Sequence, residues 1–182
     1  MGQIMCEHMT ENGVPLKKSL FIFGNLVPDI LVTFIFNKHS FKNCHLRLKT
    51  LLAKVYKASP AKRMVFSYYS GVAAHYICDF LCYAHTTAYE GNLRDHMAYE
   101  KSQTCNGIDV LPLYNRDSKR YDLTELIDAL EERIARRVQL LAANAEISLA
   151  DIPIAMSIAS WAASAAYFYF NNSSSNDFFS YS

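Results

Sequence analysis

Two pairs of a histidine and a carboxylate residue, each spaced four apart, are the part of the sequence best suited to chemistry. His75 precedes Asp79, and His96 precedes Glu100. On a helix this spacing places both side chains of a pair on one face. Two such pairs that face each other can hold metal ions in the core of a helical bundle. The sequence therefore predicts a metal site with mixed imidazole and carboxylate ligands.

The residues around the first pair sharpen this hypothesis. Their side chains are apolar on both sides of it, and a buried carboxylate and imidazole without a partner would be costly, so a bound cation is the economical explanation. His85 follows Asp79 by six residues. A continuous helix would turn it about 120° away, whereas a helix end near Tyr83 brings it back. Oxygen and imidazole ligands without cysteine favour zinc over iron, manganese or calcium. A lone His-x-x-x-Asp pair is more often an ordinary surface or core pair, so the hypothesis depends on the three spacings together.

Further motifs precede these residues in the chain. The first motif is Gly24-Asn25-Leu26-Val27-Pro28-Asp29, and the second is His39-Ser40. Both come before the two pairs and His85. Five elements in this order, over residues 8–100, resemble the bacterial zinc-dependent phospholipases C. The resemblance implies a first zinc ion held by Asp29, His39, His75 and Asp79, and a second held by His85, His96 and Glu100.

A third zinc ion is left open by the same resemblance. In the family Asp79 would bridge to it, an early histidine, here His8, would bind it, and an N-terminal tryptophan exposed by processing would complete it. The only tryptophan of this chain is Trp161, although removal of Met1 would leave a free amine near His8. His45 is an alternative to His39 in the first site.

The resemblance implies a zinc-dependent phosphodiester hydrolase, in which a metal-activated water attacks the phosphorus of a phospholipid headgroup ester. Asp29 would act as ligand, as general base or as both. Four aromatic residues are candidates for an apolar approach or for the core: Tyr56, Phe66, Tyr68 and Tyr83. Two alternatives remain. The first is a nuclease or nucleotidase, although in that group the last ligand pair lies further from the preceding histidine and ends in Asp. The second is a catalytically inactive, metal-stabilised helical protein.

Apolar periodicity predicts an all-α, single-domain, multi-helix bundle with the metal site in its core. The domain is expected over residues 1–170, followed by a polar, disordered tail over 171–182. Helices are predicted at 15–24, 30–36, 41–57, 59–83, 93–104, 122–141 and 149–170, with Asp122 and Glu125 forming a capping box. A turn is expected at Gly24-Asn25.

The composition narrows the classes of partner. With 18 basic and 17 acidic residues the net charge is near zero, so no stable nucleic-acid partner is expected and membrane contact is expected to be transient. The first ten residues lack the apolar segment of a signal peptide, which favours a cytoplasmic location. Ile152–Phe170 is interpreted as a buried helix, with a C-terminal membrane anchor as the alternative. The five cysteines are interpreted as reduced, mostly buried thiols.

Overall fold

The computed structural model describes residues 1–30, 41–58, 62–86, 88–106, 120–143 and 151–171. Within these ranges the chain is helical and contains no strand, so the predicted all-α fold is confirmed. The elements are α1 (Gly2–Glu11), α2 (Lys18–Ile30), α4 (Phe41–Ala58), α5 (Arg63–Leu81), the short 3₁₀ helix η2 (Tyr83–His85), α6 (Leu93–Asn106), α7 (Leu123–Ala143) and α8 (Asp151–Asn171).

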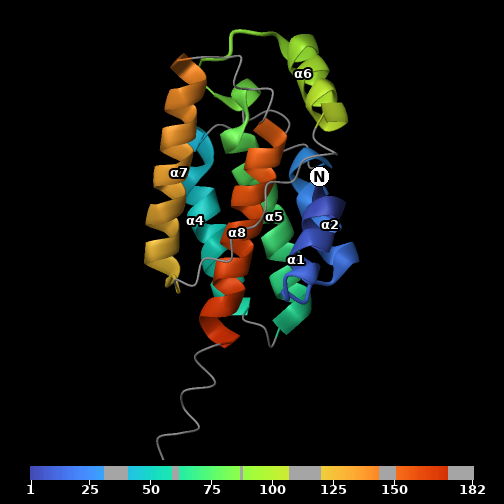
Figure 1. Cartoon of the computed structure of the whole chain (residues 1–182), viewed down its shortest axis with the longest axis vertical. Helices are drawn as coiled ribbons and strands as arrows, with labels where there is room; N and C mark the ends of the chain where they lie inside the picture. Colours follow the sequence, from blue (N-terminus) through green and yellow to red (C-terminus); the bar gives the residue numbers. More distant parts are fainter. Residues whose placement is uncertain (31–40, 59–61, 87, 107–119, 144–150, 172–182) are drawn as a thin grey trace, which may run out of the picture.

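Helix α5 is the centre of the bundle. Helices α2, α4 and α8 pack most extensively against it, and α1 and α7 lie further out (Figure 1). Every side chain from Ser70 to Leu81 is buried. A helix that is apolar all round has to be enclosed by other helices. This enclosure places the His75–Asp79 pair inside the protein rather than on its surface.

Two glycines allow α2 to approach α5 at backbone distance. A Cβ on Gly24 would lie 2.2 Å from the carbonyl oxygen of Tyr68, and a Cβ on Gly71 would lie 2.1 Å from that of Phe21. Both distances are far below van der Waals contact, so only glycine fits at either position. The close crossing fixes the end of α2, and with it Asp29, beside the last turns of α5.

The outer helix α7 is amphipathic, as predicted, and begins with the predicted capping box. The backbone N–H of Asp122 donates to Glu125 Oε2 at 3.0 Å, and the N–H of Glu125 donates to Asp122 Oδ1 at 2.8 Å. These two bonds satisfy donors that the first turn of a helix leaves open. The core face of α7 consists of Leu126, Leu130, Ile134, Arg137 and Leu141.

Helix α8 covers another side of α5 through small side chains. Ala155, Ala159 and Ala162 are buried, and Trp161 is 7% exposed. The prediction of a buried core helix is therefore confirmed for this segment. In the described part of the chain, no helix combines the length and the apolar character that crossing a membrane requires.

Some predicted boundaries differ from the structure. Helix α2 begins at Lys18 and continues through Gly24-Asn25 to Ile30, with Pro28 inside it, where the sequence predicted a turn. Packing of Gly24 on α5 overrides the turn preference of this pair. Helix α1 was not predicted at all. Three predicted segments lie partly outside the described residues: the helix over 30–36 beyond Ile30, the first residues of the helix over 59–83 and the first residues of the helix over 149–170. The predicted tail is described only at its first residue, 171.

The cysteines agree with the prediction of reduced thiols. Cys6, Cys44, Cys78 and Cys82 are buried thiols rather than members of disulfides. The side chain of Cys105 lies outside the described residues. Burial raises the pKa of the Cys6 and Cys44 thiols, which keeps both in the neutral form.

Candidate metal centre

His75 and Asp79 lie together on the last turns of α5. The Nε2 atom of His75 is 3.1 Å from Asp79 Oδ2, as the spacing of four residues predicts. Both side chains are almost enclosed, with 7% and 11% of their surface exposed. The proximity predicted for this pair is thus found in the structure, inside the bundle.

Asp29 reaches the same imidazole from the end of α2. Its Oδ1 is 3.5 Å from His75 Nε2, while 65% of the Asp29 side chain is exposed. Asp29 therefore lies at the boundary between the buried pair and solvent. The glycine contact between α2 and α5 is what brings it there, because Asp29 is far from His75 in the sequence.

His85 faces the other oxygen of Asp79. Helix α5 ends at Leu81, and Cys82 adopts an extended conformation with φ −94° and ψ 140°. The chain then forms η2, which places His85 Nε2 at 3.8 Å from Asp79 Oδ1. The prediction that a helix end near Tyr83 returns His85 toward Asp79 is confirmed. One carboxylate consequently faces two imidazoles, one with each oxygen.

His96 approaches His85 from helix α6. The two imidazole rings stand nearly perpendicular with centroids 4.7 Å apart, and the Tyr89 ring lies 5.9 Å from His96. Glu100 is on α6 one turn beyond His96, but its side chain lies outside the described residues. His39 also lies outside them. Of the second predicted pair, the structure therefore describes the side chain of His96 only.

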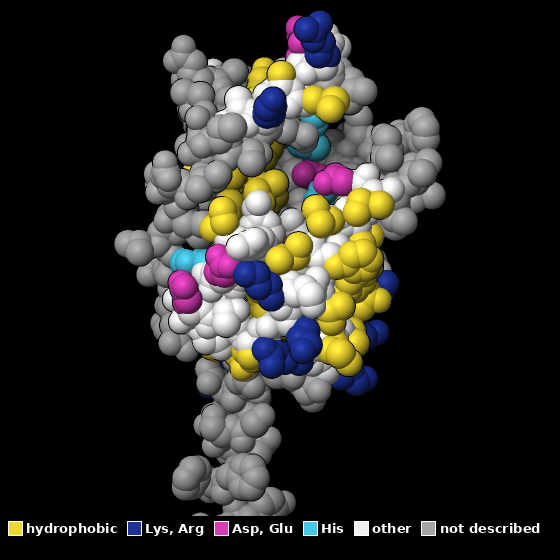
Figure 2. All heavy atoms as spheres, turned by 90° about the vertical axis from the view of Figure 1, so that its right-hand side faces the viewer, with side chains coloured by type: hydrophobic (Ala, Val, Ile, Leu, Met, Phe, Trp, Pro, Cys, Tyr) yellow, Lys and Arg dark blue, Asp and Glu magenta, His cyan; other side chains and the backbone are white. Residues whose placement is uncertain are grey.

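A cavity of about 330 Å³ lies over this group of residues. Figure 2 shows histidine and acidic side chains together in a hollow of one face of the molecule. The described residues that line the cavity include Met1, Gly2, Asp29, His75, Asp79, Cys82, His85 and Tyr99. The N-terminus thus reaches the cavity, whereas His8 is on α1 and is not among the described lining residues.

The carboxylates beside His75 act on the pKa of its imidazole. Burial lowers the pKa of His75, but the nearby Asp79 carboxylate, followed by Asp29 and a hydrogen bond to the backbone of Asn25, outweighs burial and raises it. The surrounding carboxylates therefore favour the protonated form of the imidazole. A metal ion bound there would replace that proton as the source of positive charge.

The donors present suit a zinc ion. Imidazole nitrogen and carboxylate oxygen are ordinary zinc ligands, and a ligating histidine usually bonds a backbone group through its other ring nitrogen. The hydrogen bond between His75 and the backbone of Asn25 is of this kind. Among the described side chains, however, no three His, Cys, Asp or Glu residues assemble into a complete metal site. The contacts in that part of the chain instead link successive donors, from Asp29 to His75, from His75 to Asp79 and from Asp79 to His85.

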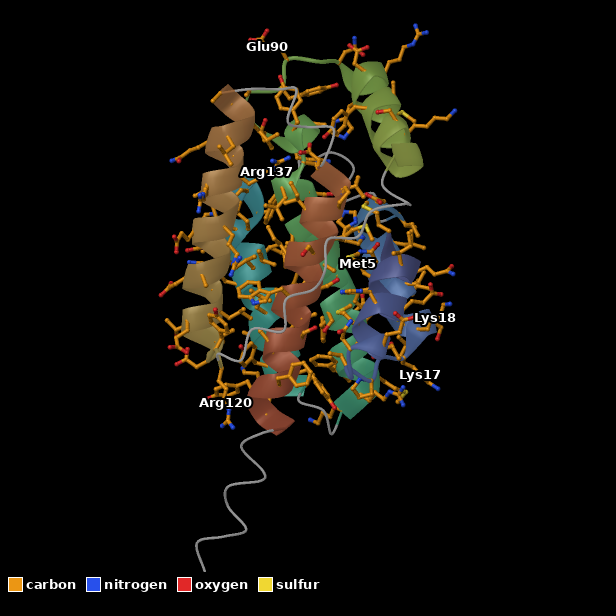
Figure 3. The ribbon with its side chains drawn as sticks, in the orientation of Figure 1. Met5, Lys17, Lys18, Glu90, Arg120 and Arg137 are labelled. Carbon is orange, nitrogen blue, oxygen red and sulfur yellow. The ribbon has the colours of Figure 1, made fainter. Side chains whose placement is uncertain are left out.

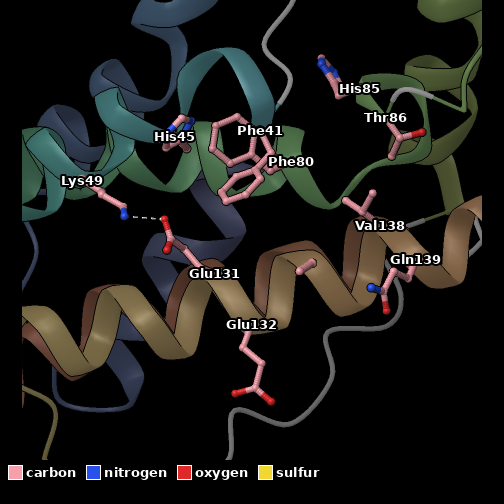
Figure 4. A pocket seen from close by; sticks show the side chains of 11 residues that line it. Phe41, His45, Lys49, Phe80, His85, Thr86, Glu131, Glu132, Val138 and Gln139 are labelled. Carbon is pink, nitrogen blue, oxygen red and sulfur yellow. Dashed lines mark ion pairs between the residues drawn. The ribbon is translucent and has the colours of Figure 1, made fainter.

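A second and larger cavity adjoins the first at His85. It has a volume of about 880 Å³ and lies between α4, the end of α5 and α7 (Figure 4). Its lining includes the apolar residues Phe41, Phe80, Ala135 and Val138 and the polar residues His45, Lys49, Glu131, Glu132 and Gln139. We call this cavity the α4–α7 groove. His45, the alternative ligand, lies here with its ring 5.8 Å from that of Phe41.

The aromatic residues singled out from the sequence are not among the described residues that line either cavity. Tyr56 and Phe66 are buried in the core, which was the second interpretation offered for them. The aromatic residues found at the cavities are instead Phe41, Phe80 and Tyr99. The apolar pattern of residues 122–141 predicts Arg137 on the solvated side of its helix, and this prediction is wrong, because Arg137 is buried in an ion pair with Asp151. Sequence reasoning missed Asp151 itself, which also bonds Tyr99, because these residues are close only in the folded chain.

A comparison with protein families identifies a matching family. The sequence model described as zinc-dependent phospholipase C matches residues 3–147, which is most of the chain. The match includes all the residues that the sequence predicted as metal ligands. Searches of curated proteins and of solved structures returned no significant match.

Proposed function

Because the chain belongs to the zinc-dependent phospholipase C family, we propose that it is a phosphodiester hydrolase that cleaves the headgroup ester of a phospholipid. The observation that carries the proposal is the position of Asp79. It faces His75 with one oxygen and His85 with the other, beside a cavity that also reaches Asp29. Carboxylates shared between imidazoles at the floor of a cavity are suited to holding cations next to a substrate.

The proposed ligands are those implied by the sequence. Asp29, His39, His75 and Asp79 would hold one zinc ion, and His85, His96 and Glu100 a second. Three contacts support the assignment: Asp29 with His75, His85 with Asp79, and His96 with His85. Asp79, His8 and the N-terminal amine are proposed for a third ion, which the presence of Met1 and Gly2 at the cavity supports.

The chemistry divides between the metal and the protein. Bound zinc lowers the pKa of water toward neutrality and supplies positive charge to phosphoryl oxygens. The protein orients the substrate and moves the proton, and Asp29 is the proposed group for the second task. Its side chain is 65% exposed yet lies 3.5 Å from His75 Nε2, so it can reach both the metal ligands and a bound molecule.

The α4–α7 groove supports a lipid as the substrate. It begins at His85 and is lined by the rings of Phe41 and Phe80. Its one described lysine, Lys49, is already paired with Glu131 at 2.9 Å (Figure 4). A nucleic-acid site needs a positively charged groove that follows the phosphates. The accessible surface of the groove is mainly apolar, which suits the diacylglycerol portion of a phospholipid better.

A paired substrate assay tests this proposal. Zinc-loaded protein should release phosphorylated headgroup from phosphatidylcholine vesicles and from a soluble phosphodiester such as bis(p-nitrophenyl) phosphate. The His75→Ala variant should lose both activities. Turnover of single-stranded nucleic acid without lipid cleavage would instead assign the chain to the nuclease class, and zinc binding with no turnover would make it a structural metal protein.

The groove can be tested separately from the metal centre. Ala135 is exposed on α7 and lines the groove, so the Ala135→Trp variant should fill it without disturbing the core. We expect hydrolysis of the vesicles to fall and hydrolysis of the soluble phosphodiester to continue. The control is Arg136→Trp, a neighbouring exposed position that is not among the groove's described lining residues. Equal effects of the two variants would contradict the role of the groove.

A further inference from the structure

Asp151, the first residue of α8, joins four elements of the bundle through one carboxylate. The residue is fully buried. Its Oδ1 pairs with Arg137 of α7, which lies between α7 and α8 (Figure 3). Its Oδ2 accepts a hydrogen bond of 2.7 Å from the backbone N–H of Tyr83 in η2, and another from the Tyr99 hydroxyl of α6. A carboxylate at a helix N-terminus is also stabilised by the helix dipole.

One of these bonds controls the position of η2, which carries His85. A 3₁₀ helix of three residues has weak internal hydrogen bonding and needs support from outside. Asp151 supplies it at Tyr83, two residues before His85. Local hydrogen bonds add to this support: the N–H of His85 donates to the carbonyl of Cys82 at 3.1 Å, and that of Thr86 donates to the carbonyl of Tyr83 at 3.0 Å.

The other bond controls the position of α6, which carries His96. Tyr99 follows His96 by three residues, so both side chains lie on the same side of the helix. Tyr99 also packs edge-on against Tyr83, with ring centroids 6.5 Å apart. Bonding of Tyr99 to Asp151 therefore holds this face of α6 against η2, where the rings of His85 and His96 meet.

The arrangement also explains why a buried arginine is present. Arg137 is 6% exposed, and a buried cation is costly unless a carboxylate pairs with it. Its charge is matched by Asp151, and the other Asp151 oxygen is occupied by the two donors from η2 and α6. Asp151 is thus engaged with protein groups rather than turned toward the cavity.

From these contacts we propose that Asp151 is a positioning residue for the second metal site. Through Tyr83 and Tyr99 it holds η2 and α6 in the relative position that lets His85 and His96 bind one ion. This inference rests on the proposed function, which supplies the metal. Asp151 itself lies beyond residues 3–147, so it is not part of the stretch that matches the family.

The test compares two variants that each lose one phenolic hydroxyl that makes a hydrogen bond within the protein. Tyr99→Phe removes the bond to Asp151. Tyr56→Phe removes a bond of 2.7 Å to the carbonyl of Tyr121, on another side of the bundle. Metal-free protein is titrated with zinc against a chromophoric chelator, which resolves the separate binding steps and requires no turnover. Asp151→Asn is the stronger variant, used if it folds.

We expect Tyr99→Phe to weaken one zinc-binding step about 10–100-fold, as loss of a group that orients metal ligands typically does, and to leave the other step unchanged. Tyr56→Phe should leave both steps unchanged. Unaltered zinc binding in Tyr99→Phe would overturn the inference, and so would an equal weakening in both variants. Wild-type protein that binds no zinc would instead overturn the proposed function.

Discussion

Two buried aspartates, Asp79 and Asp151, show how similar groups can be arranged for different purposes. Asp151 faces the permanent positive charge of Arg137. Asp79 faces His75 and His85, whose rings are charged only when protonated. Asp151 is fully enclosed, whereas Asp79 borders a cavity of about 330 Å³ that Asp29 also lines.

This difference indicates that the buried charge of Asp151 is structural and that the charge of Asp79 is available for chemistry. The protein itself supplies the counter-charge for Asp151 through Arg137. At Asp79 the counter-charge can come from a proton on an imidazole or from a metal ion, and the cavity gives a ligand access. Substitutions in and around the two regions should separate them, in order of decreasing effect.

The largest effect is expected from removing His75. Losing a residue that merely orients a metal ligand costs 10–100-fold in metal affinity or activity. Losing the ligand should cost more, so His75→Ala should reduce phosphodiester hydrolysis by more than about 10²-fold. His45→Ala, which removes the histidine of α4, should retain the zinc content of the wild type. Zinc loss from His45→Ala would show that the alternative ligand assignment is the correct one.

Among these substitutions, breaking the ion pair of Arg137 and Asp151 should lower the free energy of unfolding most. Arg137→Met leaves the Asp151 carboxylate buried without its cation, which typically costs about 3–5 kcal/mol. Denaturant unfolding of metal-free protein measures this cost. A double variant, Arg137→Met with Asp151→Leu, should recover part of it, because both charges are then absent. A loss below about 1 kcal/mol in the single variant would contradict the view that this pair is a buried structural tie.

The crossing of α2 and α5 connects stability with the metal centre. In Gly71→Ala the new Cβ would meet the carbonyl oxygen of Phe21 at 2.1 Å, so the helices must move apart. Overpacking of this kind costs about 1–3 kcal/mol. It should also move Asp29 away from His75 and weaken zinc binding.

Gly13→Ala is the matched control for that experiment. Gly13 has φ +86°, and no heavy atom lies within 4 Å of the position that a Cβ would take, so the change adds backbone strain without separating helices. It should lower stability by roughly 1 kcal/mol and leave zinc affinity intact. Equal zinc affinities in the two variants would contradict the coupling between the helix crossing and the metal centre.

The smallest effect is expected at a buried hydrogen bond remote from both aspartates. The Tyr56 hydroxyl donates to the carbonyl of Tyr121 at 2.7 Å and ties α4 to the start of α7. Burial raises the pKa of Tyr56 far above its usual range, so the hydroxyl remains a donor throughout the working pH range. Tyr56→Phe should cost about 1 kcal/mol in unfolding free energy. A change in hydrolysis at full zinc occupancy would contradict its purely structural role.

Local sequence patterns predicted the features that depend on neighbours in the chain. The helices from 41 onward, the capping box of Asp122 and Glu125, and the meeting of His75 with Asp79 all follow from spacing within one segment. The return of His85 was predictable for the same reason, because it needs only a helix end and a short connection. That these residues bind zinc remains a prediction.

Features that depend on distant segments could not be predicted in this way. The turn expected at Gly24-Asn25 was wrong because Gly24 contacts the backbone of α5, a contact that local propensity does not contain. Tyr83 and Asp151 are 68 residues apart, and nothing in either segment indicates their hydrogen bond. The family resemblance, and no local pattern, predicted that Asp29 lies close to His75.

Elemental analysis of wild-type protein purified without chelator tests the central claim most directly. We predict about two zinc ions per chain, or about three if the N-terminal amine takes part, because each proposed site supplies the three or four ligands that zinc requires. The Asp79→Asn variant, measured in parallel, should contain less. Wild-type protein without bound metal would contradict the proposed metal centre and leave a helical bundle with an unusual cluster of histidines and aspartates.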